Sequence, residues 1–84
     1  MFQKKQFGER LCEVRKKHNE KQKELAEILG VRDSQICEIE NGNRTTTVER
    51  IVLICRHYNI SADYLLGLTD DPKPHKRKKE EEPQ

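Results

Sequence analysis

Residues 22–44 read QKELAEILGVRDSQICEIENGNR, and this stretch decides the fold. Its apolar residues fall in two short runs and recur at the spacing of side chains that share one face of an α-helix. Gly30 separates the two runs. A glycine adopts the positive φ that ends a helix and turns the chain within a few residues. The stretch therefore predicts two short helices joined by a tight corner.

The residue types in this stretch indicate how the two helices pack. Leu25 and Leu29 are one helical turn apart and would face Ile36 and Ile39 of the next helix. Ala26 is small where the helices would nearly touch. Two helices held at about 90 to 120° form a helix-turn-helix. Its second helix protrudes and can enter a DNA major groove about 12 Å wide.

Three further helices are predicted around this unit, which makes the fold class all-α with five helices. The apolar spacing predicts a first helix over residues 4–18, ended by Asn19. A fifth, short helix is predicted after the capping residue Ser61 and before Gly67. No segment shows the alternating pattern of a strand.

The fourth predicted helix begins after Thr47, a suitable N-cap, and ends at Asn59. It has the broadest apolar face in the chain, so we expect it at the centre of the domain. That face comprises Val48, Ile51, Val52, Ile54, Cys55 and Tyr58.

The last residues differ in composition from the rest of the chain. Residues 70–84 read DDPKPHKRKKEEEPQ, in which charged residues and prolines replace apolar ones. Such composition predicts a disordered tail. The HKRKK block could contact phosphates without sequence preference, but the neighbouring acids favour a solvated tail that compensates its own charge. We expect a helix-turn-helix domain over residues 1–69 and a charged, disordered tail over residues 70–84.

Composition limits the other classes of function. The 84 residues suffice for one small domain, and 17 basic against 15 acidic residues leave a net charge of only +2. No apolar run is long enough for a membrane span or a signal peptide, so a cytoplasmic protein is expected. Cys12, Cys37 and Cys55 form no CxxC pair and have no histidine at ligand spacing. No metal site, cofactor, catalytic group or small-molecule site is indicated.

The order of these elements resembles the lambda-repressor and Cro-like helix-turn-helix family, also called the xenobiotic-response-element type. The resemblance rests on FGERLCEVRKKH, QKELAEILGV, IENG and TTVERIVLICRHYNISADYLLG, and covers about residues 7–68. It implies a compact five-helix DNA-binding domain of the kind found in bacterial and phage transcriptional regulators, which usually bind operators as dimers.

The resemblance also implies roles for individual residues. Arg15 and Glu40 correspond to an ion pair between the first helix and the end of the third. Base contacts are expected from Asp33, Ser34 and Glu38. Phosphate contacts are expected from Gln22, Arg32, Asn41, Asn43 and Arg44. Lys21 and Lys23 are not part of the family pattern, but they flank Gln22 and are also expected to lie near phosphate.

Two positions depart from the family pattern at the start of the second helix. Glu20 stands where the family usually has a leucine, and Lys21 where it has a Ser or Thr cap. The missing cap should weaken the helix start by about 1 kcal/mol unless another group substitutes for it.

The acids of the third helix are unexpected in a segment that faces DNA, because phosphates repel them. A carboxylate can still accept a hydrogen bond from cytosine N4. For Asp33 we favour a capping role at the helix start. For Glu38, base contact and a solvated position near Arg32 or Ser34 are both open.

These features predict a sequence-specific transcriptional regulator, a repressor that binds a palindromic operator as a homodimer through its third helix. The alternative is a protein-interaction module of antitoxin or anti-repressor type. Tyr58, Tyr64 and Leu65 are candidates for the dimer interface, although a core role is favoured for each. Cys37 and Cys55 are interpreted as small buried fillers, with a redox sensor as the alternative.

Overall fold

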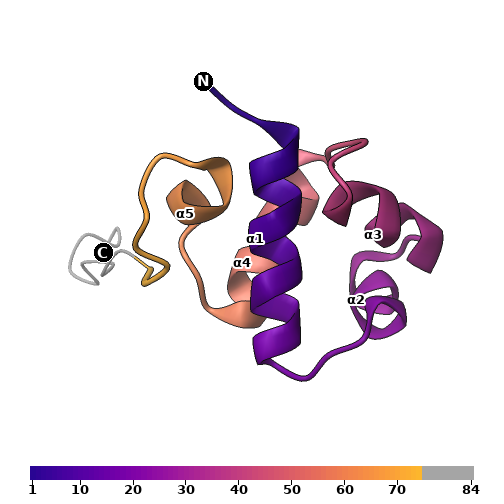
Figure 1. Ribbon diagram of the computed structural model, residues 1–84. Coiled ribbons are helices and arrows are strands. Elements are labelled where there is room, and N and C mark those ends of the chain that lie inside the picture. The colour runs from indigo at the N-terminus through magenta and orange to yellow at the C-terminus, as the bar shows by residue number, and fades with distance from the viewer. Residues whose placement is uncertain (75–84) are drawn as a thin grey trace.

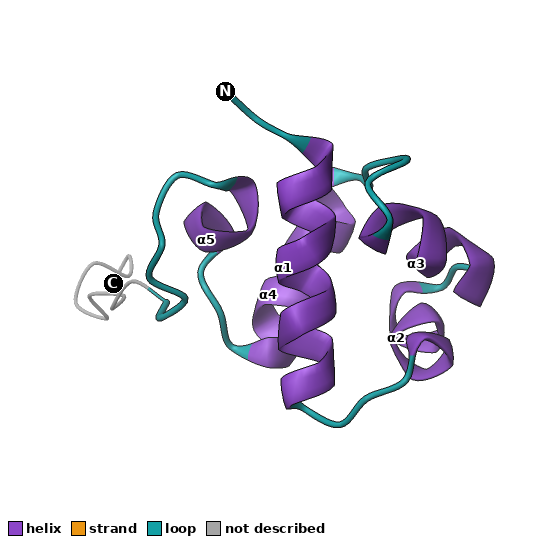
Figure 2. Cartoon of the chain, viewed as in Figure 1, coloured by secondary structure: helices purple, strands orange, loops and turns teal. Residues whose placement is uncertain are grey.

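The computed structural model describes residues 1–74, and this part of the chain consists of helices and loops without strands (Figure 2). Its five α-helices are α1 (Lys4–Lys17), α2 (Gln22–Leu29), α3 (Asp33–Glu40), α4 (Val48–Tyr58) and α5 (Ala62–Leu66). The predicted all-α, five-helix fold is confirmed. None of these helices is long and apolar enough to cross a lipid bilayer. The HKRKK block lies outside the described residues.

The helices are arranged around α1, with α2 and α3 on one side and α5 on the other (Figure 1). α2 packs against α3, and α1 packs against both α3 and α5. Every helix contributes to one hydrophobic core. The largest fully buried side chains are Phe7, Leu11, Leu25, Ile36, Ile39, Ile54 and Leu65.

The helix ends follow the predicted capping residues. Thr47 Oγ1 accepts a hydrogen bond from the backbone N–H of Arg50 (3.2 Å), and Ser61 Oγ accepts one from Tyr64 (3.3 Å). Asn59 ends α4 with a φ of +55°. Local residue chemistry therefore sets the start and end of α4 and the start of α5.

The start of α2 lacks a Ser or Thr cap, as expected, but another group substitutes for it. The Lys21 backbone N–H donates a hydrogen bond to Glu24 Oε1 (2.7 Å), three residues further along. Lys21 itself offers no side-chain acceptor. The acidic side chain therefore substitutes in part for the missing Ser or Thr cap, and it also lies favourably at the positive end of the helix dipole.

The apolar face of α4 is less buried than its sequence indicated. Ile54 and Tyr58 are buried, but Val48 is 73% exposed and Val52 and Leu53 are each 44% exposed. α4 packs against α2 and α5, and these contacts leave Val48, Val52 and Leu53 partly uncovered. α4 was expected to form the centre of the domain. It packs against α2 and α5, whereas α1, which crosses in front of α4 in Figure 1, packs against α3 and α5.

α1 and α3 approach each other closely at Gly8, a residue that the sequence analysis did not identify. A Cβ atom at this position would lie 2.2 Å from the carbonyl oxygen of Ile39 and 2.8 Å from that of Glu40. Only a glycine allows the two backbones to be this close. Gly8 therefore fixes the distance between α1 and the C-terminal end of α3.

A buried ion pair connects the same two helices. Arg15 Nε and Nη2 donate to the two carboxylate oxygens of Glu40 at 2.6 and 3.0 Å, with side chains only 9% and 5% exposed. Gln22 Nε2 donates to Glu40 Oε1 (2.9 Å), and Arg15 Nη1 donates to the carbonyl of Glu20 (2.6 Å). Burial raises the pKa of Glu40, but these hydrogen bonds and the charge of Arg15 outweigh it and lower the pKa overall.

A second polar cluster joins the α1–α2 loop to α4. The Tyr58 hydroxyl donates to Glu20 Oε1, and His57 Nε2 lies 2.7 Å from Glu20 Oε2. Burial raises the pKa of Glu20, while the bonds from Tyr58 and His57 lower it, and the net pKa lies below the ordinary value. Glu20, which stands where the family usually has a leucine, therefore has a hydrogen-bond partner at each carboxylate oxygen. These bonds connect the segment before α2 to α4.

The segment after α5 folds back onto the helices. Arg10 Nη1 donates to the carbonyl of Thr69 and Arg10 Nη2 to Asp70 Oδ1, both at 2.7 Å. The Ser61 backbone N–H donates to the carbonyl of Pro72 (2.9 Å). Residues 70–72 thus contact the domain, and the division at residue 69 stays a prediction.

Replacing Gly8 with alanine should destabilise the domain, because the added methyl group forces α1 away from the end of α3. We expect Gly8→Ala to lower the free energy of unfolding by about 1–3 kcal/mol, measured by urea denaturation. Glu9→Ala, at the exposed neighbouring position on α1, is the matched control. Equal stabilities of the two variants would contradict the close contact.

The lowered pKa values of Glu20 and Glu40 predict acid sensitivity. Because the pKa values of these two groups are lower in the folded chain, the unfolded chain binds more protons in the pH range where they titrate. The two carboxylates therefore stabilise the fold at neutral pH. This stabilisation should be lost as the pH falls from about 5 through the lowered pKa values.

Urea denaturation at a series of pH values tests this sensitivity. Glu20→Gln should have a weaker pH dependence of its unfolding free energy than the wild type, whereas Glu9→Gln should match the wild type. An unchanged profile for Glu20→Gln would show that the carboxylate is not stabilised by its neighbours.

Candidate nucleic-acid interface

The corner between α2 and α3 determines which face of α3 is exposed. Gly30 takes a φ of +71°, and the Val31 backbone N–H bonds back to the carbonyl of Ala26 (3.0 Å). This tight turn places Ile36 and Ile39 against α1 and α2, where both are fully buried. The opposite face of α3 is left at the edge of the molecule, on the side away from α5 (Figure 1).

The residues predicted to contact DNA lie on this exposed side. The predicted base-contacting residues Asp33, Ser34 and Glu38 are all exposed on α3. Among the predicted phosphate-contacting residues Gln22 is partly buried, and the exposed ones are Lys21, Lys23, Arg32, Asn41, Asn43 and Arg44. The structure thus groups them at the start of α2, on α3 and in the loop after α3.

The start of α2 is suited to an anion. The first N–H groups of a helix have no partner within the helix, and the helix dipole adds partial positive charge. Lys21 and Lys23 flank this end with exposed side chains. One N–H of the Gln22 amide is bound to Glu40, which fixes the side chain and leaves the second N–H for a ligand.

The loop after α3 returns toward the helix in a Schellman turn. The Gly42 N–H bonds to the carbonyl of Ile39 (3.0 Å) and the Asn43 N–H to that of Glu38 (2.9 Å), with Gly42 at a φ of +82°. This course brings Arg44 back beside the helix, where its Nη1 lies 2.8 Å from Glu38 Oε1. Arg44, predicted to contact a phosphate, and Glu38, predicted to contact a base, therefore form an ion pair with each other.

The acids of α3 occupy three different environments. Glu40 is buried in the pair with Arg15, and Glu38, about half exposed, is paired with Arg44. Asp33 lies in the first turn of α3, where the positive end of the helix dipole favours its carboxylate as expected, but it does not cap the helix by a hydrogen bond. Arg32 occupies the N-cap position and Asp33 is the first helical residue, so its carboxylate makes no capping bond within residues 1–74.

The remaining predicted residues have structural positions. Leu65 and Tyr58 are buried and Tyr64 packs against the core, in line with the core role favoured for them. Cys37 and Cys55 are only partly buried, and Cys55 packs against the core. Burial raises the pKa of the Cys55 thiol, which disfavours its reactive thiolate.

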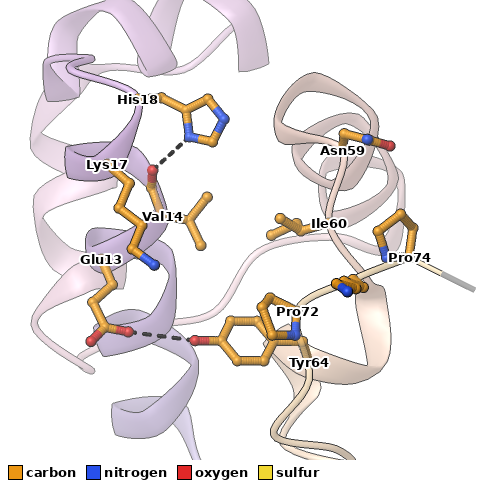
Figure 3. A pocket seen from close by; sticks show the side chains of 10 residues that line it. Glu13, Val14, Lys17, His18, Asn59, Ile60, Tyr64, Pro72 and Pro74 are labelled. Atoms are coloured by element: carbon orange, nitrogen blue, oxygen red, sulfur yellow. Dashed lines mark hydrogen bonds between the residues drawn. The ribbon is translucent and has the colours of Figure 1, made fainter.

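A cavity of about 330 Å³ lies between α1 and the α4–α5 turn (Figure 3). Val14 and Ile60 face this space, and Tyr64 lies beside Pro72 at its edge. None of the residues predicted to contact DNA lines it.

Comparison with known proteins agrees with this geometry. A family model described as a helix-turn-helix domain matches residues 8–70. The chain is 37% identical over 73 residues to the uncharacterized HTH-type transcriptional regulator YobD of Bacillus subtilis, covering 87% of this chain and 65% of YobD. It is 32% identical over 61 residues to the antitoxin PezA of Streptococcus pneumoniae, covering 73% of this chain and 39% of PezA. The chain thus spans less than two thirds of the length of these two relatives.

A solved structure has the same arrangement of helices. The P22 c2 repressor in complex with a synthetic operator superposes with a TM-score of 0.67 and 30% identity, over 71% of this chain and 91% of that one. The helices, the corner at Gly30 and the matched residues lead to one conclusion: the chain belongs to the helix-turn-helix domain family, with the lambda-repressor and Cro-like fold.

Proposed function

We propose that this protein is a sequence-specific DNA-binding transcriptional regulator that acts in the cytoplasm as a repressor. The observation that carries the proposal is the outward face of α3, exposed along its length and flanked at both ends by cationic and amide side chains. Two similarities support it: YobD is named a transcriptional regulator, and the P22 c2 repressor was solved with its operator. The proposed activity is binding, without a catalytic role.

In this proposal α3 lies in the major groove, and Asp33, Ser34 and Glu38 are the residues that contact base edges. Contacts to phosphates fix the orientation of the helix and come from the start of α2, the start of α3 and the loop after it. The phosphate-contacting residues are Lys21, Gln22, Lys23, Arg32, Asn41, Asn43 and Arg44.

A homodimer on a palindromic operator is part of the proposal. Four of the proposed contact residues are basic and two are acidic, so one domain attracts phosphates only weakly. Two domains related by a two-fold axis would reach half-sites about 34 Å apart and add their contacts.

A second candidate is a protein-interaction module, in which the acidic part of α3 contacts a basic protein partner. The observation that favours it is the similarity to a relative named an antitoxin. The two candidates differ in whether the chain selects a DNA sequence.

Selection from a pool of random duplexes should separate the two candidates. We expect the wild-type chain to enrich a palindromic sequence with two half-sites about one helical turn apart. Its affinity should fall linearly with log salt concentration, because counterions are released from phosphates. Recovery of no preferred sequence, together with tight binding to a basic protein, would favour the interaction module.

Two substitutions should separate base contacts from phosphate contacts on the selected operator. Ser34→Ala should change the preferred base pair at one position of each half-site. Lys23→Ala should weaken binding to all duplexes alike and reduce the slope against log salt by about 1 per domain. Fluorescence anisotropy on single-base operator variants measures both effects. An equal, sequence-independent loss for Ser34→Ala would exclude it as a base-contacting residue.

A further inference from the structure

The ion pair between Glu38 and Arg44 is held by the backbone as well as by the two side chains. The Schellman turn that ends α3 bonds the Asn43 N–H to the carbonyl of Glu38 itself, which brings the chain back beside Glu38 just before Arg44. Gly42 in this turn also packs against α1, because a Cβ there would lie 2.9 Å from Lys5 Cα. The loop is thus packed against α1, and it places Arg44 beside the exposed face of α3.

The charges around Glu38 explain why such an arrangement matters. An unpaired carboxylate placed in a DNA groove is repelled by the phosphates on both sides. Arg44 Nη1 neutralises one oxygen, Oε1, at 2.8 Å. The other oxygen, Oε2, has no hydrogen-bond donor among the described residues, and the Glu38 side chain is 52% exposed. It is free to accept a hydrogen bond from a base.

We propose that Glu38 and Arg44 act as one unit that selects a cytosine, with Glu38 as the base-contacting residue and Arg44 as its positioning residue. This inference rests on the proposed DNA-binding function. In the major groove, cytosine presents its N4 amino group as a donor, and a carboxylate can only accept. Adenine also presents an amino group, but its N7 acceptor lies beside that group and repels a carboxylate. Guanine and thymine present acceptors at this edge, and these repel a carboxylate.

The pairing changes what Arg44 is expected to do. A residue that contacts only a phosphate weakens binding to every sequence by the same factor when it is removed. Removing Arg44 from the pair also leaves Glu38 uncompensated and free to move, so the loss should depend on the base that Glu38 faces. The two side chains are about half exposed, and an exposed ion pair contributes little to folding. The effect should therefore be seen in DNA binding and not in stability.

A double-mutant cycle tests the unit. The four proteins are the wild type, Glu38→Gln, Arg44→Ala and the double variant, with Asn43→Ala as a control from the same loop outside the pair. Affinities are measured by fluorescence anisotropy on the operator selected by the wild type and on duplexes carrying each of the four base pairs at every half-site position. Thermal unfolding followed by circular dichroism should give equal midpoints for all five proteins.

The expected pattern is specific to a coupled pair. Glu38→Gln and Arg44→Ala should each reduce the preference for cytosine at one and the same position by about tenfold, in the range of one good base contact. In the Glu38→Gln background, the further change Arg44→Ala should lower affinity equally for all four base pairs. Asn43→Ala should lower affinity for every duplex alike and keep the preference for cytosine.

Two results would overturn the inference. If Arg44→Ala lowers affinity by the same factor in both backgrounds and leaves base preference unchanged, Arg44 is a phosphate contact only, and the proposed function stands without the unit. If the wild type enriches no sequence from a random pool, the proposed function fails and the unit fails with it.

Discussion

The buried ion pair between Arg15 and Glu40 is the interaction on which the rest of the structure depends. Two charges so far from water are stable only when each is paired and its remaining hydrogen-bonding positions are filled. The planar guanidinium binds both oxygens of Glu40, and Gln22 and the carbonyl of Glu20 complete the network. The network joins α1, the start of α2 and the end of α3, which are the elements that carry the proposed interface.

This pairing also explains how a helix with several acids can lie at an interface for a polyanion. Glu40 is withdrawn from the surface and Glu38 is balanced by Arg44, so within residues 1–74 Asp33 is the acid of α3 that has no ion-pair partner. Counting charges along the helix overestimates its repulsion of DNA, because the count takes no account of partners from other segments. The electrostatic character of the interface is a property of the folded domain.

Some features of the fold could not be predicted because they depend on contacts between distant segments. Helical periodicity shows which side chains share a face, but not which neighbour covers that face, and so α4 was expected to be more buried than it is. Gly8 carries no periodic signal, and its importance is visible only where the α3 carbonyls meet α1. Glu20 broke the family pattern without indicating its partners, Tyr58 and His57, which lie almost forty residues away.

The sequence by itself determined the five helices and their ends, because periodicity and capping act between residues only a few positions apart. It also placed the proposed interface on α3 and the segments next to it, although the pairing of Arg15 with Glu40, 25 residues apart, was expected only from the family resemblance. The tertiary structure decided which acids are neutralised, which apolar residues stay exposed, and that Arg44 returns to Glu38. These outcomes depend on how the helices pack, and packing brings together atoms that the order of residues does not.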